Sequence, residues 1–324
     1  MTEMTRPARW QVMAAFAAVY FIWGSTYIAI RIGVQTLPPF LMGGIRFLLA
    51  GSLLYGLSRA QGAPAPTRVH WRSALLLGAL LLMAGNGGVT WAEQKLPSSI
   101  AALLVAMVPL WMVLLDWWRP GGVRPNWQVF AGLALGTAGI ILLVGPGEMT
   151  GQVDLLAAGV LVFTTFSWAV GSLLSRRMPL PSSLLLSTGM QMLMGGVLLT
   201  TLGTATGEWA RLETSHVSLD SVLALGYLIV FGAIVAYTAY VWLLRVVPAA
   251  RVSTYAYVNP AVAIFLGWAL FHEPLEPRTL VAAAIIIAAV VIITTFRART
   301  GAPNRIRFQP VPDGAASTSG QVKV

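Results

Sequence analysis

The chain has 324 residues, of which 57% are hydrophobic and only 10% are charged, and its formal net charge is +10. A soluble domain carries about 25% charged residues, so this charge is too sparse to cover a water-soluble protein of this size. The basic residues lie between apolar segments and form no continuous stripe with aromatic residues, which argues against nucleic-acid binding. Without cysteine the chain has no disulfide, no thiolate metal site and no cysteine nucleophile.

Ten apolar segments of about 20 residues follow one another, and each is long enough to span a bilayer. We predict an α-helix for each, because every backbone N–H and C=O group in hydrocarbon needs a partner inside the protein. The predicted helices cover residues 10–32, 40–57, 71–91, 99–117, 127–144, 155–174, 184–204, 221–244, 252–271 and 279–296. Residues 298–324 are rich in Pro, Gly, Ser and Arg, and we predict a disordered tail there.

The distribution of Arg and Lys predicts the orientation of this all-α polytopic protein. With residues 1–9 placed in the cytoplasm, the inner segments hold 16 basic residues and the outer segments hold four. Cytoplasmic loops of membrane proteins carry such an excess. We therefore predict that both termini are cytoplasmic.

The two halves of the chain resemble each other. A shift of 145 positions pairs Trp23 with Trp168 and Gly44 with Gly189, and a shift of 148 pairs the Leu–Gly at 77–78 with the one at 225–226. A later shift of 151 pairs Pro109 with Pro260. We predict one five-helix repeat over residues 10–150 and a second over residues 151–297. Because five is odd, the second repeat enters the membrane inverted, which is typical of secondary transporters, although some channels and scaffolds also contain duplications.

Several short motifs, in their order and spacing, resemble the EamA branch of the drug/metabolite transporter superfamily. They are the segments at 21–26, 46–47, 97–103 with Pro109, 248–250, 259–261 and 272–274. The resemblance implies a multi-pass protein of the bacterial inner membrane that exports amino acids and related metabolites, aromatic amino acids included. It leaves open a multidrug or other metabolite exchanger, with or without proton coupling.

Candidate substrate-binding residues combine aromatic faces with hydroxyl or amide groups near the middle of the predicted helices. Asn86 needs a polar partner in apolar surroundings, and the glycines after it allow close approach of a neighbour or a ligand. Trp23 and Trp168 are repeat mates. The full set is Trp23, Thr26, Asn86, Thr90, Trp91, Trp168, Tyr237, Tyr240, Tyr255 and Asn259. Aromatic stripes are more often packing than binding, so each residue has a structural alternative.

Three further residues are candidates for gating or structure. Arg46 is a charge well inside a helix, where it either binds a substrate carboxylate, bonds helix-end carbonyls or extends to the interface. Pro109 and Pro260 allow helix kinks at corresponding places in the two halves.

No catalytic or metal-binding pattern stands out, and we expect no cofactor. The three histidines lie in loops or at helix ends, so an integral-membrane enzyme is a distant alternative to a transporter. The expected partners are a small-molecule substrate and the lipid bilayer, and the oligomeric state is left open. Glu93 falls at a predicted helix end, where partial hydration limits its pKa shift. We therefore expect uniport, with weak or absent proton coupling.

Overall fold

The computed structural model describes residues 7–96, 101, 104–118, 124–144, 154–271 and 277–300. Within these ranges all regular structure is helical, so the all-α prediction is confirmed. Most of the motif at 97–103, the motif at 272–274 and residues 301–324 of the predicted tail lie outside the described residues. The prediction of disorder was wrong for residues 298–300, which continue the last helix of the structure.

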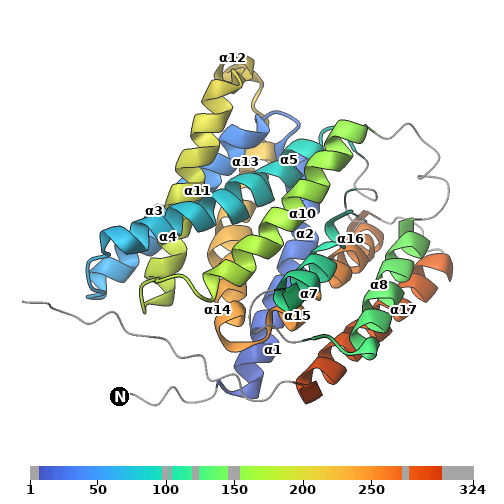
Figure 1. Cartoon of the computed structure of the whole chain (residues 1–324). Helices are drawn as coiled ribbons and strands as arrows, with labels where there is room; N and C mark the ends of the chain where they lie inside the picture. Colours follow the sequence, from blue (N-terminus) through green and yellow to red (C-terminus); the bar gives the residue numbers. More distant parts are fainter. Residues whose placement is uncertain are drawn as a thin grey trace, which may run out of the picture.

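The helices follow one another along the chain (Figure 1). Segments η1, η2 and η4 are π-helical, and η3 is a 3₁₀ turn. The first half contains α1 (Arg9–Ala17), η1 (Ala18–Ile22), α2 (Trp23–Gly33), α3 (Pro39–Ala60), α4 (Arg68–Leu77), η2 (Gly78–Gly87), α5 (Gly88–Ala92), α7 (Val108–Trp118) and α8 (Trp127–Val144). The second half contains α10 (Leu155–Ser175), α11 (Leu184–Ala205), α12 (Glu208–Arg211), η3 (Thr214–His216), α13 (Leu219–Tyr227), η4 (Leu228–Tyr237), α14 (Thr238–Val246), α15 (Ala249–Val252), α16 (Tyr255–Phe271) and α17 (Pro277–Thr300).

Among the described residues, six continuous helices are long and apolar enough to cross a membrane. They are Arg9–Gly33, Pro39–Ala60, Arg68–Ala92, Leu155–Ser175, Leu184–Ala205 and Leu219–Val246. They coincide with the first, second, third, sixth, seventh and eighth predicted helices. Many of their large apolar side chains face outward, as contact with lipid requires; Leu49, Leu53, Phe163 and Leu223 are examples.

The fourth and ninth predicted helices differ most from expectation. The fourth is interrupted by a turn at Ala106 and Met107, and α7 then begins at Val108 with Pro109 in its first turn, where a missing N–H costs nothing. The ninth is divided by a turn at Ser253 and Thr254. Their hydroxyls bond to the carbonyls of Ala250 and Arg251, an alternative to continued helix.

The pair α3 and α11 shows the internal repeat directly. Each helix has 22 residues, and their boundaries are separated by the 145 positions that the sequence comparison predicted. The two helices cross at glycines. A Cβ at Gly51 would lie 2.9 Å from the Gly189 carbonyl oxygen, and a Cβ at Gly196 would lie 3.1 Å from that of Gly44. Only glycine allows this backbone approach.

The π-helical segments η2 and η4 form a second symmetric pair. Each spans ten residues, and they begin 150 positions apart, two more than the shift of 148 predicted for this region. A π-helical turn is wider than an α-helical turn and often marks a functional site. The third helix of each half is therefore altered at the same place.

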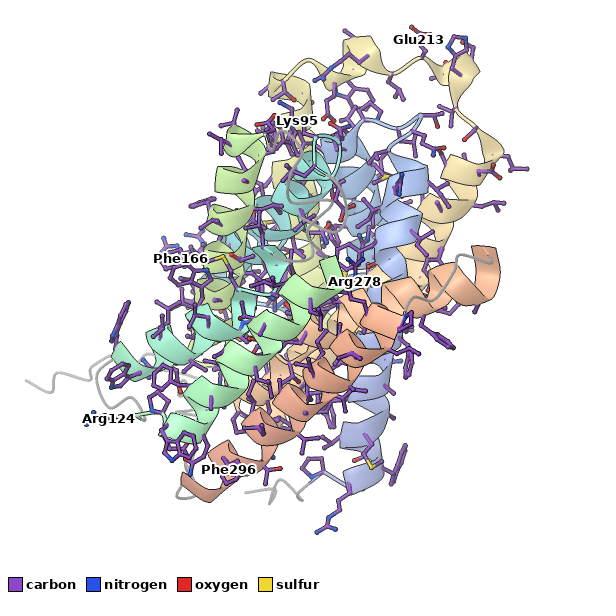
Figure 2. The ribbon with its side chains drawn as sticks, turned by 90° about the vertical axis from the view of Figure 1, so that its right-hand side faces the viewer. Lys95, Arg124, Phe166, Glu213, Arg278 and Phe296 are labelled. Carbon is purple, nitrogen blue, oxygen red and sulfur yellow. The ribbon has the colours of Figure 1, made fainter. Side chains whose placement is uncertain are left out.

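The connections define two faces of the bundle. Lys95 Nζ lies 3.8 Å from Asp154 Oδ2, and the Glu208 carboxylate accepts hydrogen bonds from the first turn of α3. We call this end the far face. At the opposite end, the N-terminal face, Arg176 Nη1 donates to the Val247 carbonyl. Figure 2 shows Lys95 and Glu213 towards one end of the molecule and Arg124 and Phe296 towards the other.

Helices α8 and α17 lie side by side at the lower right of Figure 1. Gly132 and Gly139 of α8 receive the side chains of Ile293 and Ile286. Close packing of these helices thus rests on glycines of α8 and isoleucines of α17.

Candidate functional site

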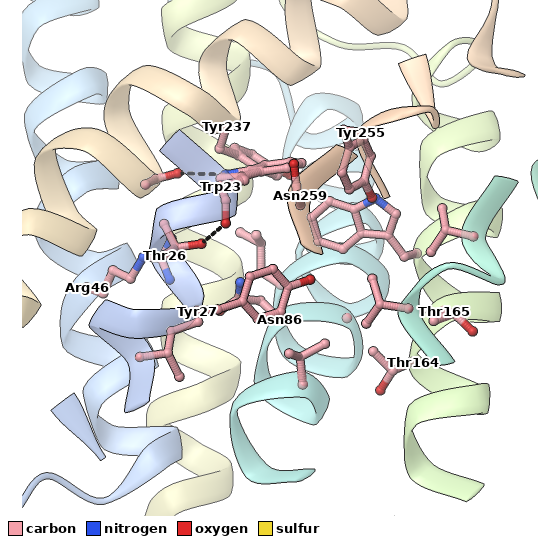
Figure 3. A pocket seen from close by; sticks show the side chains of 18 of the residues that line it. Trp23, Thr26, Tyr27, Arg46, Asn86, Thr164, Thr165, Tyr237, Tyr255 and Asn259 are labelled. Carbon is pink, nitrogen blue, oxygen red and sulfur yellow. Dashed lines mark hydrogen bonds between the residues drawn. The ribbon is translucent and has the colours of Figure 1, made fainter. Parts of the chain in front are cut away.

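A cavity lies between the two halves of the chain (Figure 3). It offers about 80 Å³ to the centres of water molecules, which is room for several waters. Residues of α2, α3, η2, α5, α10, η4 and α16 line it, together with two side chains near the start of α7. They are Trp23, Thr26, Tyr27, Ile30, Arg46, Phe47, Leu82, Gly85, Asn86, Val89, Val105, Val108, Thr164, Thr165, Trp168, Gly232, Tyr237, Tyr255 and Asn259.

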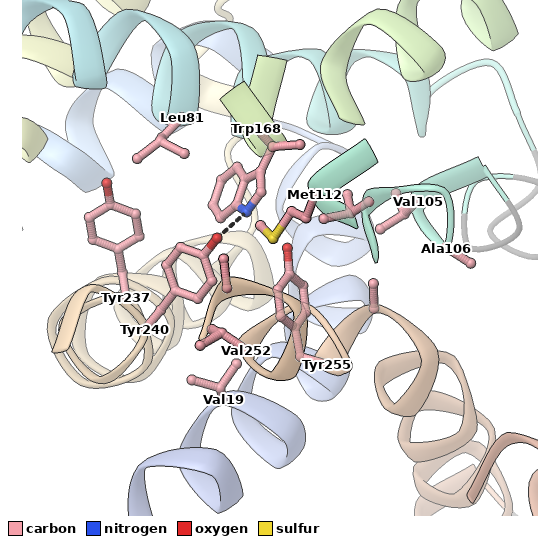
Figure 4. Close-up of a cluster of buried hydrophobic side chains, with 14 of the residues drawn as sticks. Val19, Leu81, Val105, Ala106, Met112, Trp168, Tyr237, Tyr240, Val252 and Tyr255 are labelled. Atoms are coloured by element: carbon pink, nitrogen blue, oxygen red, sulfur yellow. Dashed lines mark hydrogen bonds between the residues drawn. The ribbon is translucent and has the colours of Figure 1, made fainter. Parts of the chain in front are cut away.

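An aromatic cluster, made of Trp23, Trp168, Tyr237, Tyr240 and Tyr255, packs at the end of the cavity nearer the N-terminal face (Figures 3 and 4). The Trp23 ring centroid lies 5.6 Å from that of Trp168 and 5.0 Å from those of Tyr240 and Tyr255. Such edge-on and tilted contacts stabilise aromatic pairs beyond their buried area. Four helices from both halves are thereby held together at this end of the cavity.

Hydrogen bonds fix the aromatic cluster. The Tyr240 hydroxyl accepts from Trp168 Nε1 at 2.8 Å and lies 2.5 Å from the Ser172 hydroxyl. The Tyr237 hydroxyl donates to Gln191 at 3.0 Å. Nearer the N-terminal face, the Tyr20 hydroxyl lies 2.6 Å from the Thr254 hydroxyl. The first helix is thus tied to the ninth by polar as well as aromatic contacts.

The π-helical segments η2 and η4 supply carbonyl acceptors to the opposite half. Thr164 and Ser167 of α10 donate to the carbonyls of Ala84 and Leu80 in η2, at 3.0 and 2.9 Å. Trp23 of α2 donates through Nε1 to the Gly232 carbonyl in η4, at 3.2 Å. Each half therefore donates side-chain hydrogen bonds to backbone carbonyls on the third helix of the other half. If the halves move relative to each other, these carbonyls need new donors.

Several polar groups at the cavity have no partner among the described residues. They are the hydroxyls of Tyr27 and Tyr255 and the side-chain amide of Asn86. Asn259 differs, because its amide nitrogen, suitably oriented, donates to the carbonyls of Tyr255 and Tyr20. The Thr26 hydroxyl is bonded to its own helix at the Trp23 carbonyl. The unpaired groups are therefore available to a ligand or to water.

Of the ten predicted binding residues, seven line the cavity: Trp23, Thr26, Asn86, Trp168, Tyr237, Tyr255 and Asn259. Tyr240 lies behind it as part of the aromatic cluster. Thr90 and Trp91 do not line the cavity: the Thr90 hydroxyl donates to the Asn86 carbonyl, and Lys95 Nζ lies over the Trp91 ring. The residues of this helix that line the cavity are Leu82, Gly85, Asn86 and Val89.

The three gating or structural candidates lie in different places. Arg46 lines the cavity, whereas Pro109 and Pro260 do not. Pro260 lies inside the continuous α16, while Pro109 follows a break in the fourth helix, so the matched prolines occupy different local structures.

Tyr27, Thr164 and Thr165 line the cavity although they are not among the predicted binding residues. Tyr27 lies four positions after Trp23 on the first helix, and Thr164 and Thr165 lie four and three positions before Trp168 on the sixth. Helical spacing from Trp23 and Trp168 was the available signal, since residues three or four positions apart share a face.

Glu93 follows the apolar span Arg68–Ala92 and lies near Arg31. Its Oε1 is buried without a partner among the described residues. Burial raises the pKa of this carboxyl to about 8, although the positive charge of Arg31 acts in the opposite direction. The carboxyl is thus less hydrated than its place at a helix end predicted.

Among the described residues, no group of three or more His, Cys, Asp or Glu side chains could hold a metal ion. The described cavity lining contains no acid, histidine or cysteine. The arrangement is therefore suited to binding an organic molecule through rings, hydroxyls and an arginine.

Comparison with known proteins identifies the family. The model of the EamA-like transporter family matches residues 9–145 and again residues 155–295. "Uncharacterized inner membrane transporter YedA" of Escherichia coli (strain K12) is 41% identical over 284 residues, 87% of this chain and 90% of that protein. "S-adenosylmethionine/S-adenosylhomocysteine transporter" of Chlamydia trachomatis serovar L2 is 25% identical over 296 residues, 87% and 88% of the two chains.

A solved crystal structure superposes with a TM-score of 0.71 at 19% identity, over 89% of this chain and 98% of its own, and supports the fold alone. With its apolar helices and an inner membrane transporter among its relatives, the chain is a multi-pass inner-membrane protein. The predicted family is confirmed: the chain belongs to the EamA-like transporter family.

Proposed function

We propose that the chain exports amino acids and related amphipathic metabolites, aromatic ones included, across the inner membrane by alternating access. The observation that carries this proposal is the cavity between the halves, where aromatic faces lie beside unpaired hydroxyl and amide groups. Binding sites for small molecules combine such apolar walls with a few polar groups that fix orientation. A relative named as a transporter of S-adenosylmethionine, an amino-acid derivative, supports the same class of substrate.

Alternating access requires that the contacts closing one end of the cavity can separate. The aromatic cluster packs at the N-terminal end of the cavity, where Trp23 and Trp168 of the two halves meet. We propose that it is the inner gate, and that it opens when the first helix moves away from α10, α14 and α16. The carbonyls of η2 and η4 then change their side-chain donors, which the wide π-helical turns tolerate.

The membrane arrangement belongs to this proposal. We propose ten crossings in two inverted five-helix repeats, with the N-terminal face and both termini in the cytoplasm. The excess of Arg and Lys in segments at the N-terminal face supports this orientation.

A proton-coupled exchanger is the second candidate, and Glu93 favours it. A carboxyl with a pKa near 8 can gain and lose a proton at physiological pH. Glu93 lies at a helix end and does not line the cavity, so we propose uniport as the principal mode.

The test is flux from proteoliposomes that contain purified protein and labelled phenylalanine, tryptophan or leucine. Trp168→Phe keeps an aromatic side chain but removes the indole N–H that donates a hydrogen bond to the Tyr240 hydroxyl. Trp209→Ala, at an exposed site on α12, is the control. We expect flux for the parent and the control and several-fold slower flux for Trp168→Phe. Absence of flux with the parent for every amino acid would refute amino-acid export, and equal flux in all three proteins would place the site elsewhere.

A further inference from the structure

Arg46 is a buried cation without a counter-ion among the described residues. The residue is 4% exposed, and no described residue forms a hydrogen bond or an ion pair with the guanidinium. Its Nε is buried and has no hydrogen-bond partner in the part of the chain that the structure describes. An unpaired buried charge is strongly destabilising, so a protein that retains one has a use for it.

The surroundings of Arg46 hold the guanidinium in place without neutralising it. Its Cζ lies 4.8 Å from the centroid of the Phe47 ring, a cation–π contact. A Cβ at Gly232 would lie 2.7 Å from Nη2 and 3.1 Å from the Thr26 methyl group. Glycine at 232 therefore leaves the space that the guanidinium fills beside the backbone of η4.

The described lining of the cavity offers no negative group to this cation. Its described lining contains no Asp or Glu, and Arg46 is its one charged residue. The neighbouring polar groups of Asn86 and Tyr27 are uncharged and lack protein partners in the described ranges. A single positive charge in apolar surroundings favours a monoanion over a phosphate dianion, and the planar guanidinium fork matches a carboxylate.

We propose that Arg46 binds the carboxylate of the transported molecule, so that substrates of this chain are organic acids or amino acids with an apolar or aromatic body. This inference rests on the proposed function, because it takes transport from it. It adds the chemical group that the site requires of a substrate. The ring of the substrate then lies towards the aromatic cluster. The structural alternatives, bonding to helix carbonyls or extension to the interface, find no support, because Arg46 is enclosed and bonds no carbonyl of the described residues.

The test compares acid and amide forms of one molecule. Phenylacetate and phenylacetamide differ in the anionic group and share the ring, and phenylalanine with phenylalaninamide forms a second pair. Dissociation constants are measured by calorimetry on the purified full chain in detergent. The proteins are the parent, Arg46→Gln, Arg46→Lys and a control, Arg59→Gln, at the exposed N-terminal-face end of the same helix.

We expect the parent and Arg59→Gln to bind phenylacetate about 10- to 100-fold more tightly than phenylacetamide, as charged hydrogen bonds of this kind imply. Arg46→Gln loses that preference while its affinity for the amide stays unchanged, and Arg46→Lys is intermediate because it lacks the fork. Gly232→Ala displaces the guanidinium and lowers affinity for the acid alone, which keeps the test decisive where Arg46→Gln does not fold.

Equal affinity of the parent for both members of each pair, binding of neither member, or an unchanged preference in Arg46→Gln would each overturn the proposal. Selective binding of the acid by a parent that shows no flux in proteoliposomes would uphold the anion site and refute export. The two proposals therefore fail separately.

Discussion

Gly51→Ala tests the crossing of α3 and α11, on which the proposed symmetry of the halves depends. The added Cβ would lie 2.8 Å from the Leu193 backbone nitrogen and 2.9 Å from the Gly189 carbonyl oxygen. Contacts of a methyl carbon are comfortable at about 3.5 Å, so the helices must separate by roughly 0.6 Å. Backbone atoms cannot rotate away as a flexible side chain can. Overpacking of this kind costs about 1–3 kcal/mol.

Gly56→Ala is the matched control, because it lies in the same helix and its Cβ would meet nothing within 4 Å. Alanine there gains up to about 1 kcal/mol of helix propensity. Thermal unfolding of the purified proteins in one detergent measures both. We expect a melting temperature about 2–6 °C lower for Gly51→Ala and an unchanged or higher one for Gly56→Ala. Equal melting temperatures for the two variants would refute the close crossing.

Three further predictions address the aromatic cluster, the carboxyl at the far face and the orientation. Tyr240→Phe leaves the buried indole N–H of Trp168 without its acceptor and should lower stability by about 1–3 kcal/mol in denaturant or thermal unfolding; an unchanged midpoint would contradict the hydrogen bond. Because burial raises the pKa of Glu93 to about 8, the folded protein keeps a proton there between about pH 4.5 and pH 8, whereas the unfolded chain loses it near the ordinary pKa of 4.5. Stability should therefore fall between about pH 4.5 and pH 8, and Glu93→Gln should be the more stable protein at pH 9 but not at pH 4; parallel curves would show that the carboxyl is hydrated. A reporter that is active only outside the cytoplasm should give no signal when fused to the C-terminus, and a strong signal would overturn the proposed topology.

Helix positions were largely predictable because hydrocarbon imposes one solution on a long apolar segment. The shift of 145 positions between the two halves relates the boundaries of α11 to those of α3. Both helices carry glycines at the matching positions where they cross. The interruptions in the fourth and ninth helices were not predictable from hydropathy. They depend on which side-chain hydroxyl or proline competes with the helix, as at Ser253 and Pro109.

The cavity residues were predictable where aromatic and amide side chains stand out against an apolar background, as at Trp23, Trp168 and Asn86. The choice of face was harder. Thr90 and Trp91 are as polar or aromatic as their neighbours, but neither lines the cavity. Nothing in the sequence revealed the π-helical segments, because their carbonyls are stabilised by side chains of another helix, such as Ser167.

The central claim is that this cavity is the substrate site, and the absence of cysteine from the chain allows a direct measurement. Thr165 is buried at the cavity, and Thr206 is exposed at the far face. Each is changed to Cys, and flux is measured before and after reaction with a small polar thiol reagent, with and without excess substrate. We expect that modification of Thr165→Cys blocks flux and that excess substrate slows this modification. For Thr206→Cys, we expect that modification leaves flux unchanged and that substrate leaves the rate of modification unchanged. Normal flux through fully modified Thr165→Cys protein would contradict the account.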